Sequence, residues 1–257
     1  MRYLASVALV VAVGCGDSGL NYTVVREVPH DTDAYTQGLL LHDGSLYEST
    51  GLLGRSQLRR LDPETGAVLA SISLPADRFG EGLALLDDRL YQLTWKSRVG
   101  YVYDVSTLAL LDSFAYDSEG WGLTTDGTSL ILGDGSSTLR FLDLETFEVT
   151  REIVVRDGNS PLGALNELEY ARGHLFANVY QSDWIVRIDP ESGVVLEWID
   201  LAGILPQKKR TPVTDVLNGI AFVESTGNLL VTGKLWPTMF ELQLDWAPGE
   251  DRPAANQ

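Results

Sequence analysis

The most informative absences from this sequence of 257 residues concern cysteine and histidine. Its single cysteine, Cys15, cannot support a disulfide framework within the chain. The three histidines, His30, His42 and His174, have no spacing typical of metal ligands, so no zinc site is expected. His30 follows a predicted strand and the other two flank turns, which predicts that all three are solvated turn residues. Acidic turns such as Asp62-Pro63-Glu64 could bind calcium, but they need no metal to form a turn.

Basic residues are also scarce. Lys and Arg together number 19, against 36 Asp and Glu, which gives a formal net charge of -17. An acidic surface repels phosphate backbones and anionic lipid head groups, so nucleic acid is not an expected partner. The sequence also lacks a glycine-rich phosphate loop ahead of a helix and a G-x-S-x-G nucleophile elbow. These absences argue against nucleotide binding and serine-hydrolase chemistry.

One apolar run, residues 4–13, follows Arg2 and precedes Gly14-Cys15. It is too short for a helix that spans a membrane and is typical of an export signal. A cysteine directly after such a run resembles the lipid-attachment cysteine of bacterial lipoproteins, so we expect a signal peptide over residues 1–15 and a lipid on Cys15. The alternative is an ordinary secretory signal cut nearby. Either way, the domain is expected outside the cytoplasm, with the lipid as its only link to a membrane.

Five similar apolar triplets recur along the chain at spacings of 44, 40, 45 and 52 residues, beginning at Gln37, Glu81, Trp121, Asn166 and Asn218. Each is followed by a turn and further short strands, and turns such as "DPETG" separate the third strand of a repeat from the fourth. Repeats of roughly 40–45 residues with four strands each indicate a β-propeller. We therefore predict an all-β, five-bladed β-propeller over residues 20–245, with a flexible tail over residues 246–257.

The fifth repeat ends near Leu244 without a fourth strand, whereas residues 21–29 form a predicted strand with no repeat of their own. This N-terminal strand is expected to close the last blade. The first strand of each blade lines the central channel of a propeller, so the five residues that open the triplets should converge at one end. The ends of the second strands should form the rim of this mouth: Thr50, Trp95, Asp134, Tyr180 and Lys234.

The convergent positions carry an acid, three amides and an indole, while the third residue of each triplet stays Leu or Ile. Unlike groups on a repeated frame are typical of a functional site, although hydrogen bonds that merely plug the channel are the alternative. Glu81, beside Phe79, would be desolvated, which would raise its pKa into the range useful for proton transfer. Lys234 could stabilise an oxyanion or pair with Glu81, and amides could donate from fixed positions. Glycines beside these residues would let the strands approach closely.

Several long segments resemble the plant-type glutaminyl-peptide cyclotransferases, a family also found in bacteria. They are "AYTQGLLLHDGSLYESTGLLGRSQLR", "FGEGLALLDDRLYQLTW", "EGWGLTTDG", "LNELEY" and "LNGIAF" with "LLVTGKLWP", and the resemblance covers about residues 22–245. It implies a five-bladed propeller that converts an N-terminal glutaminyl residue of a peptide or protein into pyroglutamate and releases ammonia. It implies no zinc and no other cofactor for catalysis.

Carried over by motif, the resemblance implies that Glu81 transfers protons and that Lys234 and Asn166 complete the catalytic set. Tyr180 stands where the family often has Trp. The residues expected to bind substrate are Tyr35, Gln37, Glu48, Phe79, Trp95, Trp121, Tyr180 and Asn218.

Two other functions stay open at this point. A metal-dependent lactonase on a similar frame would need a channel rich in carboxylates, whereas the convergent set has one clear acid, Glu81. A non-catalytic propeller lipoprotein could bind a peptide at the same mouth. In each case we expect a monomer.

Overall fold

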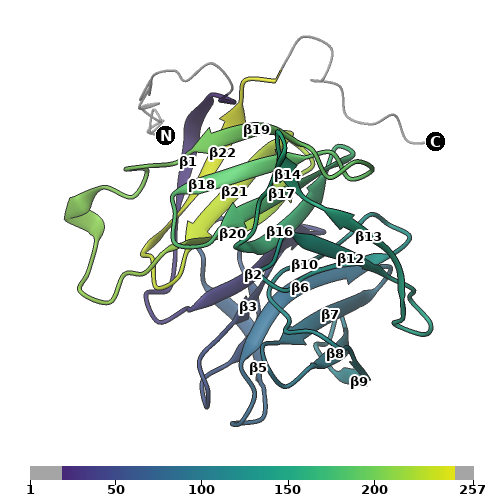
Figure 1. Ribbon diagram of the computed structural model, residues 1–257. Helices are drawn as coiled ribbons and strands as arrows, with labels where there is room; N and C mark the ends of the chain where they lie inside the picture. The colour runs from purple at the N-terminus through teal and green to yellow at the C-terminus, as the bar shows by residue number, and fades with distance from the viewer. Residues whose placement is uncertain (1–18, 247–257) are drawn as a thin grey trace.

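The computed structural model describes residues 19–246, so the predicted signal peptide, Cys15 and residues 247–257 of the predicted tail lie outside the described residues. The described chain forms five four-stranded antiparallel sheets, one small two-stranded sheet and one short 3-10 helix. The first strands of the five sheets pack against one another, with the later strands arranged outward, which is the arrangement of a β-propeller. The prediction of a five-bladed all-β propeller is confirmed (Figure 1).

The blades follow one another along the chain in the order of the sequence repeats. The strands of blade 1 are β2 (Thr36–His42), β3 (Ser45–Thr50), β4 (Gln57–Leu61) and β5 (Val68–Ser73). Those of blade 2 are β6 (Gly80–Leu86), β7 (Arg89–Thr94), β8 (Val99–Asp104) and β9 (Leu110–Ala115). Those of blade 3 are β10 (Leu123–Thr125), β11 (Leu130–Gly133), β12 (Thr138–Leu142) and β13 (Val149–Val154).

The remaining elements complete the ring. The strands of blade 4 are β16 (Leu165–Ala171), β17 (His174–Val179), β18 (Trp184–Ile188) and β19 (Val195–Asp200). Those of blade 5 are β20 (Leu217–Val223), β21 (Asn228–Gly233), β22 (Thr238–Leu244) and β1 (Tyr22–Pro29). Between blades lie the small hairpin of β14 (Arg156–Asp157) and β15 (Ser160–Pro161) and the 3-10 helix Gln207–Lys209.

The N-terminal strand closes the last blade, as predicted. β1 pairs antiparallel with β22, so the first described strand lies beside the last (Figure 1). Closure by two distant segments of the chain leaves no open gap between the first and the fifth blade.

The core consists of five apolar clusters between the blades. The third residue of each repeated triplet is at most 2% exposed, and each of the five lies in a different cluster: Leu39, Leu83, Leu123, Leu168 and Ile220. Burying such a side chain contributes about 2 kcal/mol to the free energy of unfolding. This explains why the third position stays Leu or Ile in every repeat. Trp246, at the start of the predicted flexible tail, also packs, with its ring 6.2 Å from that of Phe176.

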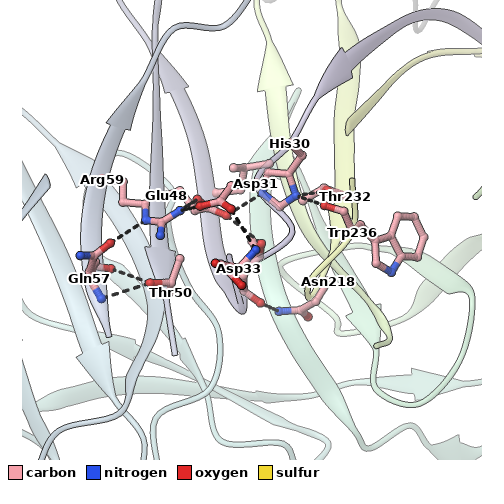
Figure 2. A network of polar contacts seen from close by, with 12 residues as sticks. His30, Asp31, Asp33, Glu48, Thr50, Gln57, Arg59, Asn218, Thr232 and Trp236 are labelled. Carbon is pink, nitrogen blue, oxygen red and sulfur yellow. Dashed lines mark hydrogen bonds and ion pairs between the residues drawn. The ribbon is translucent and has the colours of Figure 1, made fainter. Parts of the chain in front are cut away.

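A buried ionic network joins the closing strand to blade 1 and corrects the prediction for His30, which is 8% exposed rather than solvated (Figure 2). His30 follows β1, and its Nε2 lies 2.9 Å from Glu48 Oε1 while its Nδ1 lies 2.8 Å from the carbonyl oxygen of Trp236. Both partners are acceptors, so both ring nitrogens donate and the imidazole is charged. Thr36 Oγ1 donates to Glu48 at 2.7 Å, and Arg59 Nη1 lies 3.7 Å from its second oxygen.

Burial alone would lower the pKa of His30, but the charge of Glu48 and the hydrogen bond between them outweigh it and raise that pKa. Burial would likewise raise the pKa of Glu48, but the charge and hydrogen bond of His30, together with Arg59 and Thr36, outweigh it and lower that pKa. The pair therefore stabilises the fold above the ordinary pKa of Glu48, 4.5, and this contribution is lost as the pH falls below it. At the other end, the contribution of His30 is lost as the pH rises through its raised pKa.

We expect Glu48→Gln to lower the free energy of unfolding by roughly 3 kcal/mol at pH 6, because it leaves the buried imidazolium of His30 without its counter-charge. The loss should shrink as the pH rises through the pKa of His30. Urea denaturation at pH 6 and at higher pH measures both effects, with Glu145→Gln on an exposed turn as the control. A loss that is the same at every pH would contradict the charged pair.

Candidate active site

One pocket opens at the end of the propeller axis where the inner strands begin. Its volume is about 290 Å³, and its nine lining residues are Tyr35, Gln37, Phe79, Glu81, Trp95, Trp121, Asn166, Tyr180 and Lys234. All nine were predicted site residues, and every blade contributes at least one. The four polar residues among them are at most 4% exposed, while the aromatic residues are partly exposed. The pocket therefore has a polar floor and an aromatic wall.

Bulges in the inner strands aim the floor residues at the pocket. The strand pairing shifts register between Thr36 and Gly38, between Gly80 and Leu83, and between Leu165 and Leu168. These shifts contain Gln37, Glu81 and Asn166. A bulge bends its strand and redirects the side chain of the extra residue. The same positions in a regular strand would alternate into the packed spaces between the blades.

The glycines on either side of Glu81 allow neighbouring backbones to approach. A Cβ atom on Gly82 would meet the backbone of Trp121, Gly122 and Leu123 in blade 3, and one on Gly80 would meet the carbonyl oxygen of Thr50 in blade 1. Glu81 is therefore held between two close backbone contacts with other blades, and its side chain lines the pocket. This matches the expectation that glycine lets the inner strands come close to the axis.

Beneath the pocket, a polar plug fills the axis. Glu167 occupies the position that is glycine in the other four triplets, and it is fully buried. Its carboxylate accepts hydrogen bonds from the backbone N–H of Leu39 at 3.1 Å and of Ile220 at 2.8 Å, so it joins blades 1, 4 and 5. Burial raises the pKa of Glu167 well above its ordinary value, and the nearby charge of Glu169 adds to this. The sequence argument missed Glu167, although its departure from the repeat was a usable signal.

Two predicted substrate-binding residues do not line the pocket. Glu48 belongs to the ionic network with His30 and is fully buried there. Asn218 lies behind the floor, where its Nδ2 donates to the carbonyl oxygen of Thr36 at 3.0 Å and to Gln37 Oε1 at 3.2 Å. Asn218 thus leaves the amide nitrogen of Gln37 as the donor toward the pocket. Of the predicted rim, Thr50 and Asp134 also lie outside the pocket lining.

Aromatic rings from successive blades contact one another around the wall. The ring of Phe79 lies 6.1 Å from Tyr35 and 5.7 Å from Trp95, in each case edge to face. The ring of Trp121 lies 5.5 Å from Tyr180, again edge to face. Such contacts fix ring orientations and leave apolar faces for a small ligand.

An acidic and a basic side chain, Glu81 and Lys234, meet at the floor without a direct contact. Burial raises the pKa of Glu81 well above its ordinary value; the charge of Lys234 opposes this and that of Glu119 adds to it. Burial lowers the pKa of Lys234, opposed by Glu81 and Asp215. Among the described residues, no ion pair within 4.0 Å joins Glu81 to Lys234, so the direct pairing left open by the sequence is absent. The Lys234 Nζ instead lies 5.0 Å from the ring centre of Tyr35 and 5.2 Å from that of Tyr180.

The floor thus combines a buried carboxyl group with side chains that can donate hydrogen bonds. No hydrogen bond from a described residue engages the side-chain carboxylate of Glu81 or the amide of Asn166, and the buried Oδ1 of Asn166 has no partner.

Within residues 19–246 no group of three or more His, Cys, Asp or Glu is arranged to hold a metal ion. Nor does this part of the chain contain a helix long and apolar enough to cross a membrane.

The comparisons with known proteins agree on one family. A family model described as glutamine cyclotransferase matches residues 4–244. The chain belongs to the glutamine cyclotransferase family. A glutaminyl-peptide cyclotransferase of Arabidopsis thaliana is 44% identical over 230 residues, which span 87% of this chain and 71% of the relative. The crystal structure of Myxococcus xanthus glutaminyl cyclase is 35% identical, covers 89% of this chain and 98% of that chain, and has a TM-score of 0.82.

These likenesses confirm the family predicted from the sequence motifs and show that the chain is an enzyme of the glutamine cyclotransferase type. The solved glutaminyl cyclase also supports the propeller fold independently of the repeats.

In this glutamine cyclotransferase, Lys234→Met should raise the pKa of Glu81 further, because it removes the positive charge that now opposes the effect of burial. Infrared titration of the buried carboxyl group, with Glu81→Gln to assign its band, measures the shift. Lys208→Met, on an exposed lysine of the loop after β19, is the control. A Glu81 pKa that stays constant or falls in Lys234→Met would show that the two groups do not interact.

Proposed function

We propose that this enzyme converts the N-terminal glutaminyl residue of peptides or proteins into pyroglutamate and releases ammonia, with Glu81 as the acid–base residue. The observation that carries the proposal is the position of Glu81: buried on the pocket floor, with a raised pKa and no direct partner. The names of the Arabidopsis and Myxococcus proteins support the substrate class.

The shape of the pocket suits a single terminal residue. A volume of about 290 Å³ is small for a ligand site, and the mouth at the end of the axis leaves room for a peptide to continue into solvent. The aromatic wall would contact the side chain of the bound glutamine and exclude water. If the pocket binds the substrate with its α-nitrogen already close to its own side-chain amide, the conformational entropy that ring closure requires is lost on binding. The barrier of the chemical step is then lower.

The reaction joins the substrate α-nitrogen to its side-chain Cδ and breaks the bond from Cδ to the side-chain nitrogen. One proton must pass from the α-nitrogen to the departing nitrogen, which leaves as NH3. The α-nitrogen attacks as the neutral amine, so a substrate that binds as the ammonium, whose pKa is roughly 8, first releases one proton to solvent. Glu81 then accepts the proton that the α-nitrogen loses on forming the new bond and delivers it to the leaving group, so it ends in its starting state. Burial raises the pKa of Glu81, which brings it closer to the range suited to this transfer.

The carbonyl oxygen of the substrate amide gains negative charge as the α-nitrogen attacks. Lys234 would supply a positive charge and Asn166 an amide donor for this oxygen, since neither side chain has a hydrogen-bond partner among the described residues. Preorganised donors in a water-excluded site stabilise such a charge strongly. Tyr180, where the family often has Trp, keeps an edge contact with Trp121 and so can serve as the same part of the wall.

We expect Glu81→Gln to abolish ammonia release from a short peptide with N-terminal Gln, because the amide cannot carry the proton. The protein lacking residues 1–15 should turn over this peptide, and a chelator should leave the rate unchanged. Circular dichroism of Glu81→Gln checks that it folds, and Glu145→Gln on an exposed turn is the matched control. Residual activity in Glu81→Gln close to that of the unmodified protein would exclude the acid–base role.

The second candidate function is peptide binding without catalysis. It is favoured if the folded, unmodified protein releases no ammonia but still binds a peptide with N-terminal Gln, which calorimetry would detect.

We also propose that the chain is exported and anchored by a lipid on Cys15 in a bacterial envelope membrane, with the propeller a monomer in the periplasm or outside the cell. The support is the order of Arg2, the apolar run over residues 4–13 and Cys15. Full-length protein should partition into detergent, whereas Cys15→Ser should stay aqueous and sediment at the mass of one chain. Equal partitioning of the two would contradict the lipid, and a larger mass would contradict the monomer.

A further inference from the structure

Glu119 bridges the two tryptophans of the pocket wall but does not itself line the pocket. Its Oε2 accepts a hydrogen bond from Trp95 Nε1 at 2.8 Å and another from Trp121 Nε1 at 3.1 Å. Bonds from neutral donors to an ionised acceptor are stronger than those between neutral groups. One carboxylate oxygen therefore fixes the orientation of two indole rings that come from different blades.

The bridge completes the wall at a gap between aromatic contacts. Ring contacts connect Tyr35, Phe79 and Trp95 on one side, and Trp121 with Tyr180 on the other. Lys234 Nζ lies between Tyr35 and Tyr180. Glu119 occupies the corresponding place between the two tryptophans.

The loop that carries Glu119 is held against the second blade. Gly120 N–H donates to the carbonyl oxygen of Trp95 at 3.0 Å, and Thr94 N–H donates to the Tyr116 hydroxyl at 3.0 Å. Trp121 N–H donates to the carbonyl oxygen of Gly133 at 2.9 Å. Glu119 therefore sits on a short segment fixed at both ends, so its carboxylate is positioned before any ligand arrives.

We propose that Glu119 is a positioning residue that holds Trp95 and Trp121 in the orientation that receives the substrate side chain. Its effect on turnover rests on the proposed function, whereas its effect on the indoles does not. Without the carboxylate, both indole N–H groups lose their acceptor and the rings can turn, so the substrate would meet a less ordered wall.

The charge of Glu119 has a second consequence. The groups that face Glu81 are Lys234, which lowers its pKa, and Glu119, which raises it, while the neutral phenols of Tyr35 and Tyr116 lie nearby. Removing the charge of Glu119 therefore lowers the pKa of Glu81. The limb of the pH–rate profile that Glu81 controls should move to lower pH.

Three variants separate the hydrogen bonds from the charge. Glu119→Ala removes both, and the KM for a peptide with N-terminal Gln should rise about tenfold or more, with a smaller fall in kcat. Glu119→Gln keeps an acceptor oxygen without the charge, so its KM should stay closer to that of the unmodified protein while the pH limb shifts. Asp117→Asn removes a negative charge two residues away on an exposed side chain, and should change neither.

An independent measurement follows the indole N–H resonances by NMR, assigned with Trp95→Phe and Trp121→Phe. Both resonances should move upfield in Glu119→Ala and less in Glu119→Gln, whether or not the protein turns over peptide. If the unmodified protein releases no ammonia, the proposed function fails and these resonances alone decide the role of Glu119. Unchanged resonances and KM in folded Glu119→Ala would overturn the inference; if that variant does not fold, an unshifted pH limb together with unmoved indole resonances in Glu119→Gln would overturn it.

Discussion

The close approach of five inner strands around one axis is the constraint on which the rest of this structure depends. At Gly38, Gly82 and Gly122 the backbone of the next blade occupies the space that a Cβ atom would need. In the first two of these places, the residue before the glycine, Gln37 or Glu81, lies in a strand bulge that turns its side chain along the axis. The same packing that closes the ring therefore gathers unlike side chains in one pocket.

A floor of buried polar groups is costly, and the surrounding structure offsets that cost. Glu81 and Lys234 are buried without a direct partner, which disfavours the charged form of each. Directly beneath them, Glu167 accepts from backbone N–H groups of two other blades. At the seam of the ring, the pair of His30 and Glu48 holds the closing strand to blade 1 and to Trp236, two residues beyond Lys234. Stabilising contacts thus surround a site that is itself destabilising.

Repetition made most of the fold and the pocket lining predictable, because equivalent positions in a propeller face equivalent directions. The repeats could not predict contacts made outside the repeat. The partners of His30 lie 18 and 206 residues away along the chain, so its position next to a turn wrongly predicted a solvated side chain. Glu48, one of these partners, is therefore part of the ionic network and not of the pocket. Asn218 has an equivalent position to Gln37, but it donates to Gln37 instead of facing the pocket. Glu119 lies on an irregular loop between blades, outside the repeated strands, so the repeats could not predict its position.

The wall shows how a symmetric frame supports an asymmetric reaction. Aromatic rings contact one another where the blades bring them close, and a charged group bridges each of the two places where they do not. One bridge is the anion Glu119 and the other is the cation Lys234. The proposed substrate also has two ends of opposite electrostatic preference. Its amine is attracted to negative charge, and its carbonyl oxygen must be stabilised by positive charge. The five repeated blades enclose the pocket. Glu119 and Lys234, which carry opposite charges at two different places in its wall, favour one orientation of a bound substrate.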